Sequence, residues 1–198
     1  DAQWLAAIDA TQLQRIEQVL KPFPKALPKV ASRAVNKAAA SARADAVRQL
    51  TRHLNLKQKR IRRDIHLKKA SYSHWAATVS VRGQTIPLRE FATSRPIAQG
   101  RGFRRPRRGI AYIIERAKGK TTHQRMFFAQ MFSGHTGVFA RAGRERLKIH
   151  EQFGPSVGGA YEQAGHLVKE ATIYAYRNLG KYLDTQVQML LENVGGAA

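Results

Sequence analysis

The spacing of apolar positions changes along the chain, and the first third repeats with a helical period. Residues 8–20 place Ile8, Leu13 and Ile16 on one side, which predicts a short amphipathic helix. Prolines at 22, 24 and 28 end it and make a stiff connector. A second, long helix is predicted from Pro28 to Leu50, with Pro28 in its first turn. Its inward stripe consists mainly of small residues, which let another backbone approach closely: Ala31, Ala34, Val35, Ala38, Ala42, Ala46 and Leu50.

The middle of the chain has shorter segments with the alternation typical of strands. After a short helix at 55–63, for which Asn55 is the expected N-cap, strands are predicted at 73–81, 85–88, 110–115, 125–131 and 137–141. Lys118-Gly119-Lys120 is expected at the tip of a hairpin. Residues 91–109 are rich in Gly, Pro and Arg and predict a long loop, which in a compact domain is usually functional or disordered.

The C-terminal part returns to a helical period. One helix is predicted from about Val157 to Val194, with Ser156 as its cap. At about 1.5 Å per residue it would be roughly 50 Å long, so we expect its far end to pack on another subunit. The expected oligomer interface is the later part of its apolar seam, Ala175, Leu179, Leu183, Val187 and Leu190.

Together these segments predict an α+β fold, in which an antiparallel β-sheet packs with helices and a long C-terminal helix is added. Three parts are expected along the chain. Residues 1–27 form an N-terminal helix and Pro-rich connector. Residues 28–156 form the basic α+β core, which includes the Arg-rich loop 91–109. Residues 157–198 form the long helix, which packs on the core or on a neighbouring subunit.

The net charge is more informative about the partners of the chain than its overall composition. The chain of 198 residues carries a formal charge of +22, and 43% of it is hydrophobic, enough for a real core. Residues 31–150 alone carry +23, whereas 151–198 carry −2. Such an excess predicts a polyanionic or acidic partner. No apolar run is long enough to span a bilayer, so no membrane partner is expected, and there is no cysteine for disulfides or thiolate chemistry.

Candidate catalytic chemistry is sparse. The five acids of the basic middle are isolated from one another in sequence, and no Asp-x-Asp pair for Mg²⁺ occurs. The seven histidines show no metal-ligand spacing, and no phosphate-binding Gly-Lys-Ser/Thr loop is present. We therefore expect no enzymatic activity, no metal and no cofactor.

Two basic clusters are the candidate binding residues. The first is Lys57, Lys59, Arg60, Arg62, Arg63, Lys68 and Lys69. The second is Arg101, Arg104, Arg105, Arg107 and Arg108, which Gly100, Gly102 and Gly109 are expected to keep mobile. Arginine suits phosphate because its planar fork donates two parallel hydrogen bonds. Nucleic acid or an acidic protein would satisfy either cluster equally well, and an ordinary solvated face is the alternative for both.

Two segments resemble the prophage minor tail protein Z family, the tail completion proteins of long-tailed phages. The first runs from Arg33 through Asn36-Lys37 into the basic residues 57–63 and 67–70. The second, more specific, is Gly137-Val138-Phe139-Ala140-Arg141, followed by residues 146–149 and by Gly154-Pro155-Ser156-Val157. Family members tend to have Pro where this chain has Lys148, a mild departure that leaves the strand interpretation intact. The recognisable parts lie within residues 30–160.

The resemblance implies a structural neck protein in the virion, assembled in the host cytoplasm. It implies a homo-oligomeric ring, sixfold to match tail symmetry, at the head-proximal end of the tail. The implied partners are the tail terminator protein, head-completion proteins and packaged double-stranded DNA. No catalytic residue carries over.

Two other functions remain open at the level of sequence. A free basic nucleic-acid-binding protein, architectural or ribosome-associated, would have the same composition. An observation against this function is that, apart from Phe103, aromatic residues are not interspersed with the basic clusters in a pattern suited to stacking on bases. An enzyme acting on DNA would need carboxylates brought together only by the fold.

Overall fold

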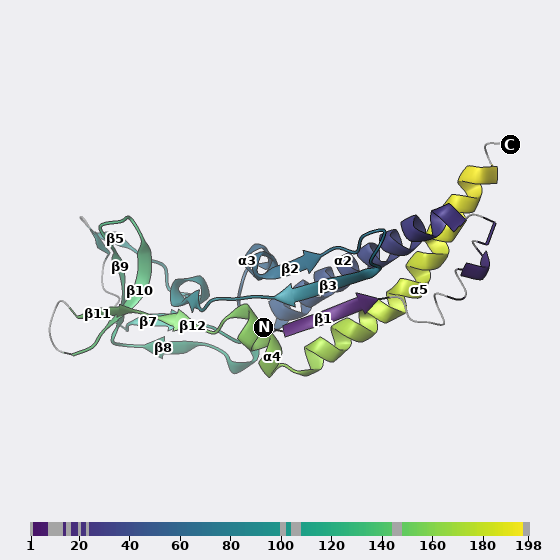
Figure 1. Cartoon of the computed structure of the whole chain (residues 1–198). Coiled ribbons are helices and arrows are strands. Elements are labelled where there is room, and N and C mark those ends of the chain that lie inside the picture. Colours follow the sequence, from purple (N-terminus) through teal and green to yellow (C-terminus); the bar gives the residue numbers. More distant parts are fainter. Residues whose placement is uncertain are drawn as a thin grey trace.

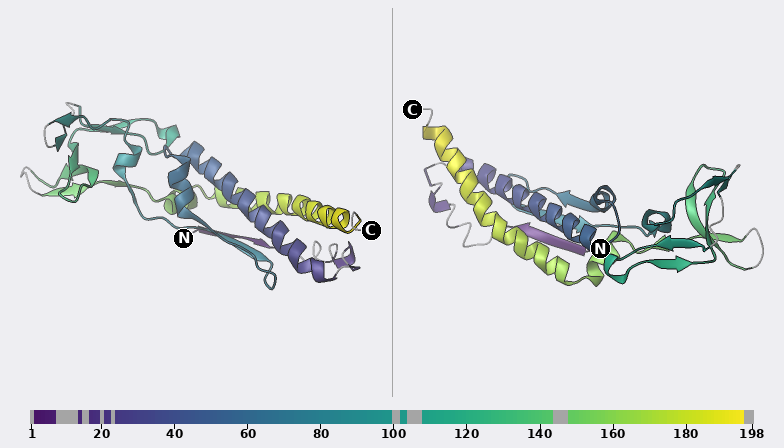
Figure 2. Two further views of the ribbon diagram at one scale, coloured as in Figure 1. Left: turned by 90° about the horizontal axis from the view of Figure 1, so that it is seen from above. Right: turned by 180° about the vertical axis from the view of Figure 1, so that it is seen from behind.

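The computed structural model describes residues 2–7, 14, 17–19, 21–22, 24–99, 102–103, 108–143 and 148–195. Figure 1 shows an elongated molecule. Two long helices and a three-stranded sheet form one end, and a group of short strands forms the other (Figures 1 and 2). The predicted α+β class, with small antiparallel sheets and a long C-terminal helix, is confirmed. Most of the predicted helix at 8–20 lies outside the described residues.

The long helix α2 spans Leu27–His53, as the small-residue stripe predicted, and follows a short 3-10 turn η1 at Pro24–Ala26. Its alanines 34, 38, 42 and 46 are fully buried. Because they have only a methyl side chain, α2 packs closely against helix α5 and against the sheet. Lys37 lies over the Tyr182 ring, 5.1 Å from its centroid, and Arg48 bonds Tyr174, so α2 and α5 run antiparallel.

The sheet beside α2 has the order β1-β3-β2 and is antiparallel throughout. Its strands are β1 at Ala2–Ala7, β2 at Ile65–Lys68 and β3 at Ala76–Val81. The hydrophobic pattern predicted β3 only. Strand β1 has no regular alternation of apolar and polar residues, and β2 has only four residues; hydrogen bonds to β3 complete both strands.

Asn36 connects α2 to this sheet. Its amide nitrogen donates to the Ala70 carbonyl at 3.0 Å, and its carbonyl oxygen accepts from the Ala70 backbone N–H at 2.7 Å. This pair of hydrogen bonds fixes the start of the β2–β3 connection on the helix surface. The Asn36-Lys37 dipeptide therefore holds α2 to both of its neighbours, the sheet through Asn36 and α5 through Lys37.

The other end of the molecule is built of short antiparallel pairs. Strands β9 at Met126–Gln130, β10 at Thr136–Arg141 and β11 at Ile149–Glu151 form one sheet in the order β11-β10-β9. Strand β7 at Ile110–Tyr112 pairs β8 at Thr121–His123, and their connection contains the 3-10 turn η3 at Arg116–Lys118 and the expected turn at Gly119. Strand β4 at Ile86–Pro87 pairs β12 at Phe153–Gly154 and continues into the 3-10 turn η2 at Leu88–Phe91.

Two helix predictions require correction. The short helix α3 spans Gln58–Asp64, and its N-cap position is Lys57, without a side-chain cap; the backbone N–H of Asn55 instead donates to the Ile114 carbonyl at 2.9 Å. The single C-terminal helix is two helices, α4 at Val157–Gln163 and α5 at His166–Gly195. Gly165, a poor helix former, lies in the break. The break allows α4 to pack near β1, β3 and α3 while α5 follows α2. Ser156 does cap α4, accepting from the Gly159 N–H at 2.9 Å.

Candidate nucleic-acid or acidic-partner interface

The first basic cluster lies on α3, in the turn before it and on β2. Helix α3 buries Ile61 and Asp64, and most of its other side chains are exposed. The cations Lys57, Lys59, Arg62, Arg63, Lys68 and Lys69 are all exposed. Six of the seven residues in this predicted cluster are therefore placed where a phosphate or carboxylate of a partner can reach them.

Arg60 is the exception, and its assignment to partner binding is corrected. Its side chain is only 11% exposed. One guanidinium nitrogen, Nη1, donates to Asp64 Oδ2 at 2.6 Å, and Nε lies 3.4 Å from Glu90 Oε1. Arg60 thus joins α3 to η2 within the chain, and its charge is already balanced by two carboxylates.

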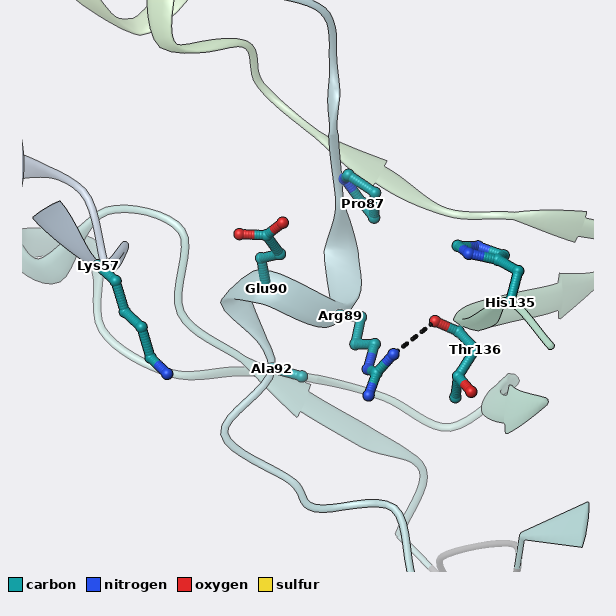
Figure 3. A pocket seen from close by; sticks show the side chains of 7 residues that line it. All are labelled: Lys57, Pro87, Arg89, Glu90, Ala92, His135 and Thr136. Atoms are coloured by element: carbon teal, nitrogen blue, oxygen red, sulfur yellow. Dashed lines mark hydrogen bonds between the residues drawn. The ribbon is translucent and has the colours of Figure 1, made fainter. Parts of the chain in front are cut away.

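A hollow of about 510 Å³ lies where α3 and η2 approach the β9–β10 turn. In Figure 3, Lys57 lies on one side of it and Arg89 and His135 on the other. Arg89 Nη1 donates to the Thr136 carbonyl at 3.0 Å, which fixes the guanidinium at the rim. Glu90 is also at the rim, but Arg60 is its ion-pair partner. The hollow therefore offers a carboxylate or phosphate two cations.

The second cluster falls largely outside the described residues: Arg101, Arg104, Arg105 and Arg107 do, and Arg108 is exposed in a turn. In the described part of segment 91–109, a strand pair is present where a loop was predicted: β5 at Ala98–Gln99 pairs β6 at Gly102–Phe103. Phe103 anchors this hairpin edge-on against Phe128, with ring centroids 6.5 Å apart.

Gly109 was expected to keep the second cluster mobile, and the structure contradicts this. Its backbone has φ +77° and is buried against β8. A Cβ atom there would lie 2.2 Å from the His123 carbonyl oxygen. Only glycine fits here, because the backbone of residue 109 contacts the backbone of β8. This contact fixes the position of residue 109 at the end of the loop.

The predicted oligomer-interface residues lie mainly in the core of the single chain. Ala175 and Leu179 are 1% exposed and Leu183 is 4% exposed. Val187 and Leu190 are partly buried and pack against the same core. The seam is occupied by α2, because the small residues of that helix leave room for it. A contact between subunits along α5 would have to use its opposite face.

That opposite face carries large apolar side chains that are not part of the predicted seam. On it, Ile173 is 58% exposed and Tyr176 is also exposed. Met189 and Leu191, nearer the end of α5, are exposed as well but point to nearly opposite sides of the helix. The signal in the sequence was weak because these residues alternate with Arg177, Lys181 and other polar positions.

The titratable groups show little sign of a reaction centre. Among the described residues, no three His, Asp or Glu side chains are grouped to hold a metal ion. Within the same part of the chain, no helix has the length and apolarity needed to cross a membrane. Burial, reinforced by the negative charges of Asp45 and Glu170, raises the pKa of the Tyr161 hydroxyl well above its ordinary value of 10.0. Tyr161 is a core residue, so this shift concerns stability rather than catalysis.

The fold and this surface together define a basic α+β protein with a group of exposed cations on α3 and β2. The family model of the prophage minor tail protein Z (GPZ) matches residues 12–193. The chain belongs to this family, and it is therefore a structural protein of a bacteriophage tail and a component of the virion. The match extends well beyond the residues 30–160 that carried the resemblance. No curated protein and no solved structure matches the chain significantly.

Proposed function

We propose that this protein completes the tail, forming a ring at its head-proximal end that helps the tail to join the filled head and positions the leading end of the DNA. The observation that carries this proposal is the concentration of exposed cations on α3, β2 and the rim of the hollow, in a member of a tail protein family. Such a surface suits a place beside packaged DNA and the acidic surfaces of neighbouring proteins. Tail terminator and head-completion proteins are the proposed neighbours.

The ring is a homo-oligomer, sixfold to match the tail. The elongated shape supports it, because long subunits lying side by side share extended flanks (Figures 1 and 2). The outer face of α5, with Ile173 and Tyr176, is the proposed contact between subunits. Large apolar side chains exposed on one face of a helix are typical of an interface.

The proposed role requires no chemical step, and no enzymatic activity is proposed. In the described part of the basic middle, each acidic side chain already has a basic partner: Asp45 has Arg48, Asp64 and Glu90 have Arg60, and Glu115 has Lys118. Asp64 and Glu90 do approach each other, but the cation between them is the guanidinium of Arg60. The arrangement favours a structural role over a metal-dependent nuclease.

Cryo-electron microscopy of intact particles and of free tails tests the placement. We expect density for this chain as a ring between the last tail ring and the head. Density confined to the capsid interior or to the distal tip would contradict the proposal.

A pair of substitutions on α5 tests the subunit contact. Ile173→Asp should leave the chain folded, because its side chain is exposed, but should reduce ring formation measured by light scattering and particle assembly. Ala175→Asp, two residues away and buried, should instead destabilise the monomer by about 4 kcal/mol or more, since it buries a charge. Normal rings from a folded Ile173→Asp protein would exclude this face as the interface.

A further inference from the structure

The sheet β1-β3-β2 packs on α2, and the outward positions of β2, with Thr78 and Ser80 of β3, are polar. In β2, Ile65 is buried while His66 and Lys68 are exposed. In β3, Ala77, Val79 and Val81 are buried, and Thr78 and Ser80 between them face outward with hydroxyl groups. The register pairs His66 with Ser80 and Lys68 with Thr78, so a cation or imidazole lies beside a hydroxyl in each pair.

Two shallow hollows adjoin on this outer face. The first is lined by His66, Lys68, Thr78, Ser80 and Arg82, with Leu67 beside them. The second shares His66 and Arg82 with it and extends to Arg63 and Asp64 at the end of α3. Because they share two residues, the hollows form one continuous surface, which we call the sheet face.

The sheet face is strongly positive. Arg63, Lys68 and Arg82 are all exposed on it. Asp64 is the only carboxylate among the residues that line the two hollows, and Arg60 bonds it at 2.6 Å. Three cations are thus left to face solvent; Arg63 has only a distant contact, 3.9 Å, with Asp64.

The side chains of the sheet face favour nucleic acid over protein. The cores of protein–protein interfaces are enriched in aromatic and other large apolar residues. Leu67 is the only large apolar side chain among the described residues lining the hollows, and it is half-buried. Arg, Lys, Ser and Thr are the residues that contact phosphate oxygens of DNA without reading its sequence. The sheet face has all four.

We infer that the sheet face binds the phosphate backbone of double-stranded DNA, with Arg63, Lys68 and Arg82 as the charged contacts and Thr78 and Ser80 as hydroxyl donors. This inference rests on the proposed function, in which the ring receives the DNA end. It assigns a DNA contact to the sheet, in addition to any that the arginine-rich loop makes, and it adds Thr78, Ser80 and Arg82 to the binding residues. Binding should not depend on sequence.

The test compares two triple variants of the full chain with equal loss of charge. The first is Arg63→Gln, Lys68→Gln and Arg82→Gln on the sheet face. The control is Lys29→Gln, Lys120→Gln and Arg125→Gln, three exposed cations elsewhere. Affinity for a short DNA duplex is measured by fluorescence anisotropy over a range of salt concentrations. Circular dichroism verifies that both variants are folded, and association with purified tails is measured separately.

For the sheet-face variant we expect an affinity loss on the order of tenfold or more at low salt, and a salt-dependence slope reduced by about 2 to 3, because three phosphate contacts release fewer counterions. The control should keep most of the wild-type slope. Two duplexes of different sequence should bind alike.

Equal losses in the two variants, or no DNA binding by the wild type at low salt, would overturn the inference. So would a sheet-face variant that keeps its DNA affinity but no longer binds tails, since the face would then serve an acidic protein. If the wild type joins tails while DNA binding fails, the inference is wrong and the proposed function stands. If the wild type joins no tails, the proposed function itself fails.

Discussion

Neighbouring residues of the same type have different roles in this protein, and α3 is the clearest example. Arg60 points inward to Asp64 and Glu90, whereas Arg62 and Arg63 point outward. A carboxylate as buried as Asp64 is stable only with a bonded cation, because burial removes its hydration. The charge of Arg60 therefore stabilises the fold, and that of its neighbours is available to partners.

Replacing Arg60 tests whether its charge stabilises the fold while the charges of its exposed neighbours do not. Arg60→Ala should lower the free energy of unfolding by about 3 kcal/mol, because it leaves Asp64 buried without its cation. Arg62→Ala, on the exposed side of the same helix, should change it by less than about 0.5 kcal/mol. Urea denaturation measures both. Equal, small effects would mean that the Arg60 ion pairs contribute nothing to stability.

Tyr161 makes the stability depend on alkaline pH. Its raised pKa means that the folded chain keeps the phenolic proton above pH 10, whereas the unfolded chain loses it. Below that pH both states hold the proton and the contribution is constant. As pH rises above 10, the unfolded state is favoured by up to about 1.4 kcal/mol per pH unit.

Tyr161→Phe removes this titration while keeping the ring. The variant should lose less stability than the wild type between about pH 9 and about pH 11, since phenylalanine has no proton to lose. Chemical denaturation at a series of pH values measures the difference. Parallel pH profiles for the two proteins would contradict the raised pKa.

At the scale of elements, close backbone contacts hold the short strands in register. Strands β7 and β8 pair over only three residues each, and Gly109 lets the chain enter β7 in close contact with the end of β8. Helices α2 and α5 follow the same principle with alanines, whose small side chains bring the two helix backbones together. Small residues therefore determine where the elements of this protein meet.

Two glycines with similar backbone angles distinguish the cost of a left-handed conformation from the cost of a steric contact. Gly109 has φ +77° and Gly134 has φ +81°, but only at Gly109 does a Cβ collide with a neighbour. Gly134→Ala should cost about 1 kcal/mol from its left-handed conformation alone. Gly109→Ala should cost about 3 kcal/mol, because the contact with His123 adds to that strain. Thermal unfolding distinguishes them; equal shifts would show that β8 can move away.

At the scale of the whole molecule, exposed cations and exposed apolar residues lie on different surfaces. The sheet face and the hollow near η2 carry exposed cations, while the outer face of α5 carries exposed apolar residues. An elongated subunit with two such surfaces can contact a copy of itself through one and a polyanion through the other (Figure 1). Self-repulsion within a chain of charge +22 favours such assembly with acidic partners.

The arginine-rich loop offers a prediction at this scale. Arg104, Arg105, Arg107 and Arg108 changed together to Ser should leave the unfolding transition nearly unchanged, since surface substitutions have small effects. Head joining, measured as the titre of infectious particles, should fall by on the order of tenfold, because four phosphate or carboxylate contacts are lost. The same four residues changed to Lys retain the charge and should restore most of the titre. Normal titre from the Ser variant would mean that the loop only decorates the surface.

Much of the fold could be predicted from local patterns. The helix at 27–53, strands β3, β9 and β10 and the Ser156 cap follow from periodicity and capping alone. Strands β1 and β2 were not predicted, because the hydrogen-bond partner of β1 lies far away in sequence and β2 has only four residues. The exposed cations of the candidate site could also be predicted from the sequence. Nothing in the local sequence, however, distinguished the ion-paired Arg60 from the exposed Arg62.

The sequence by itself determined the α+β class, the concentration of positive charge in residues 31–150 and the family, since each depends on residue type and spacing along the chain. Only the tertiary structure decided which charges are free and which apolar residues are exposed. Asp64 and Glu90 take Arg60 out of the binding surface, and α2 covers Ala175, Leu179 and Leu183. The physical reason is that desolvation and charge neutralisation depend on groups that meet only after folding.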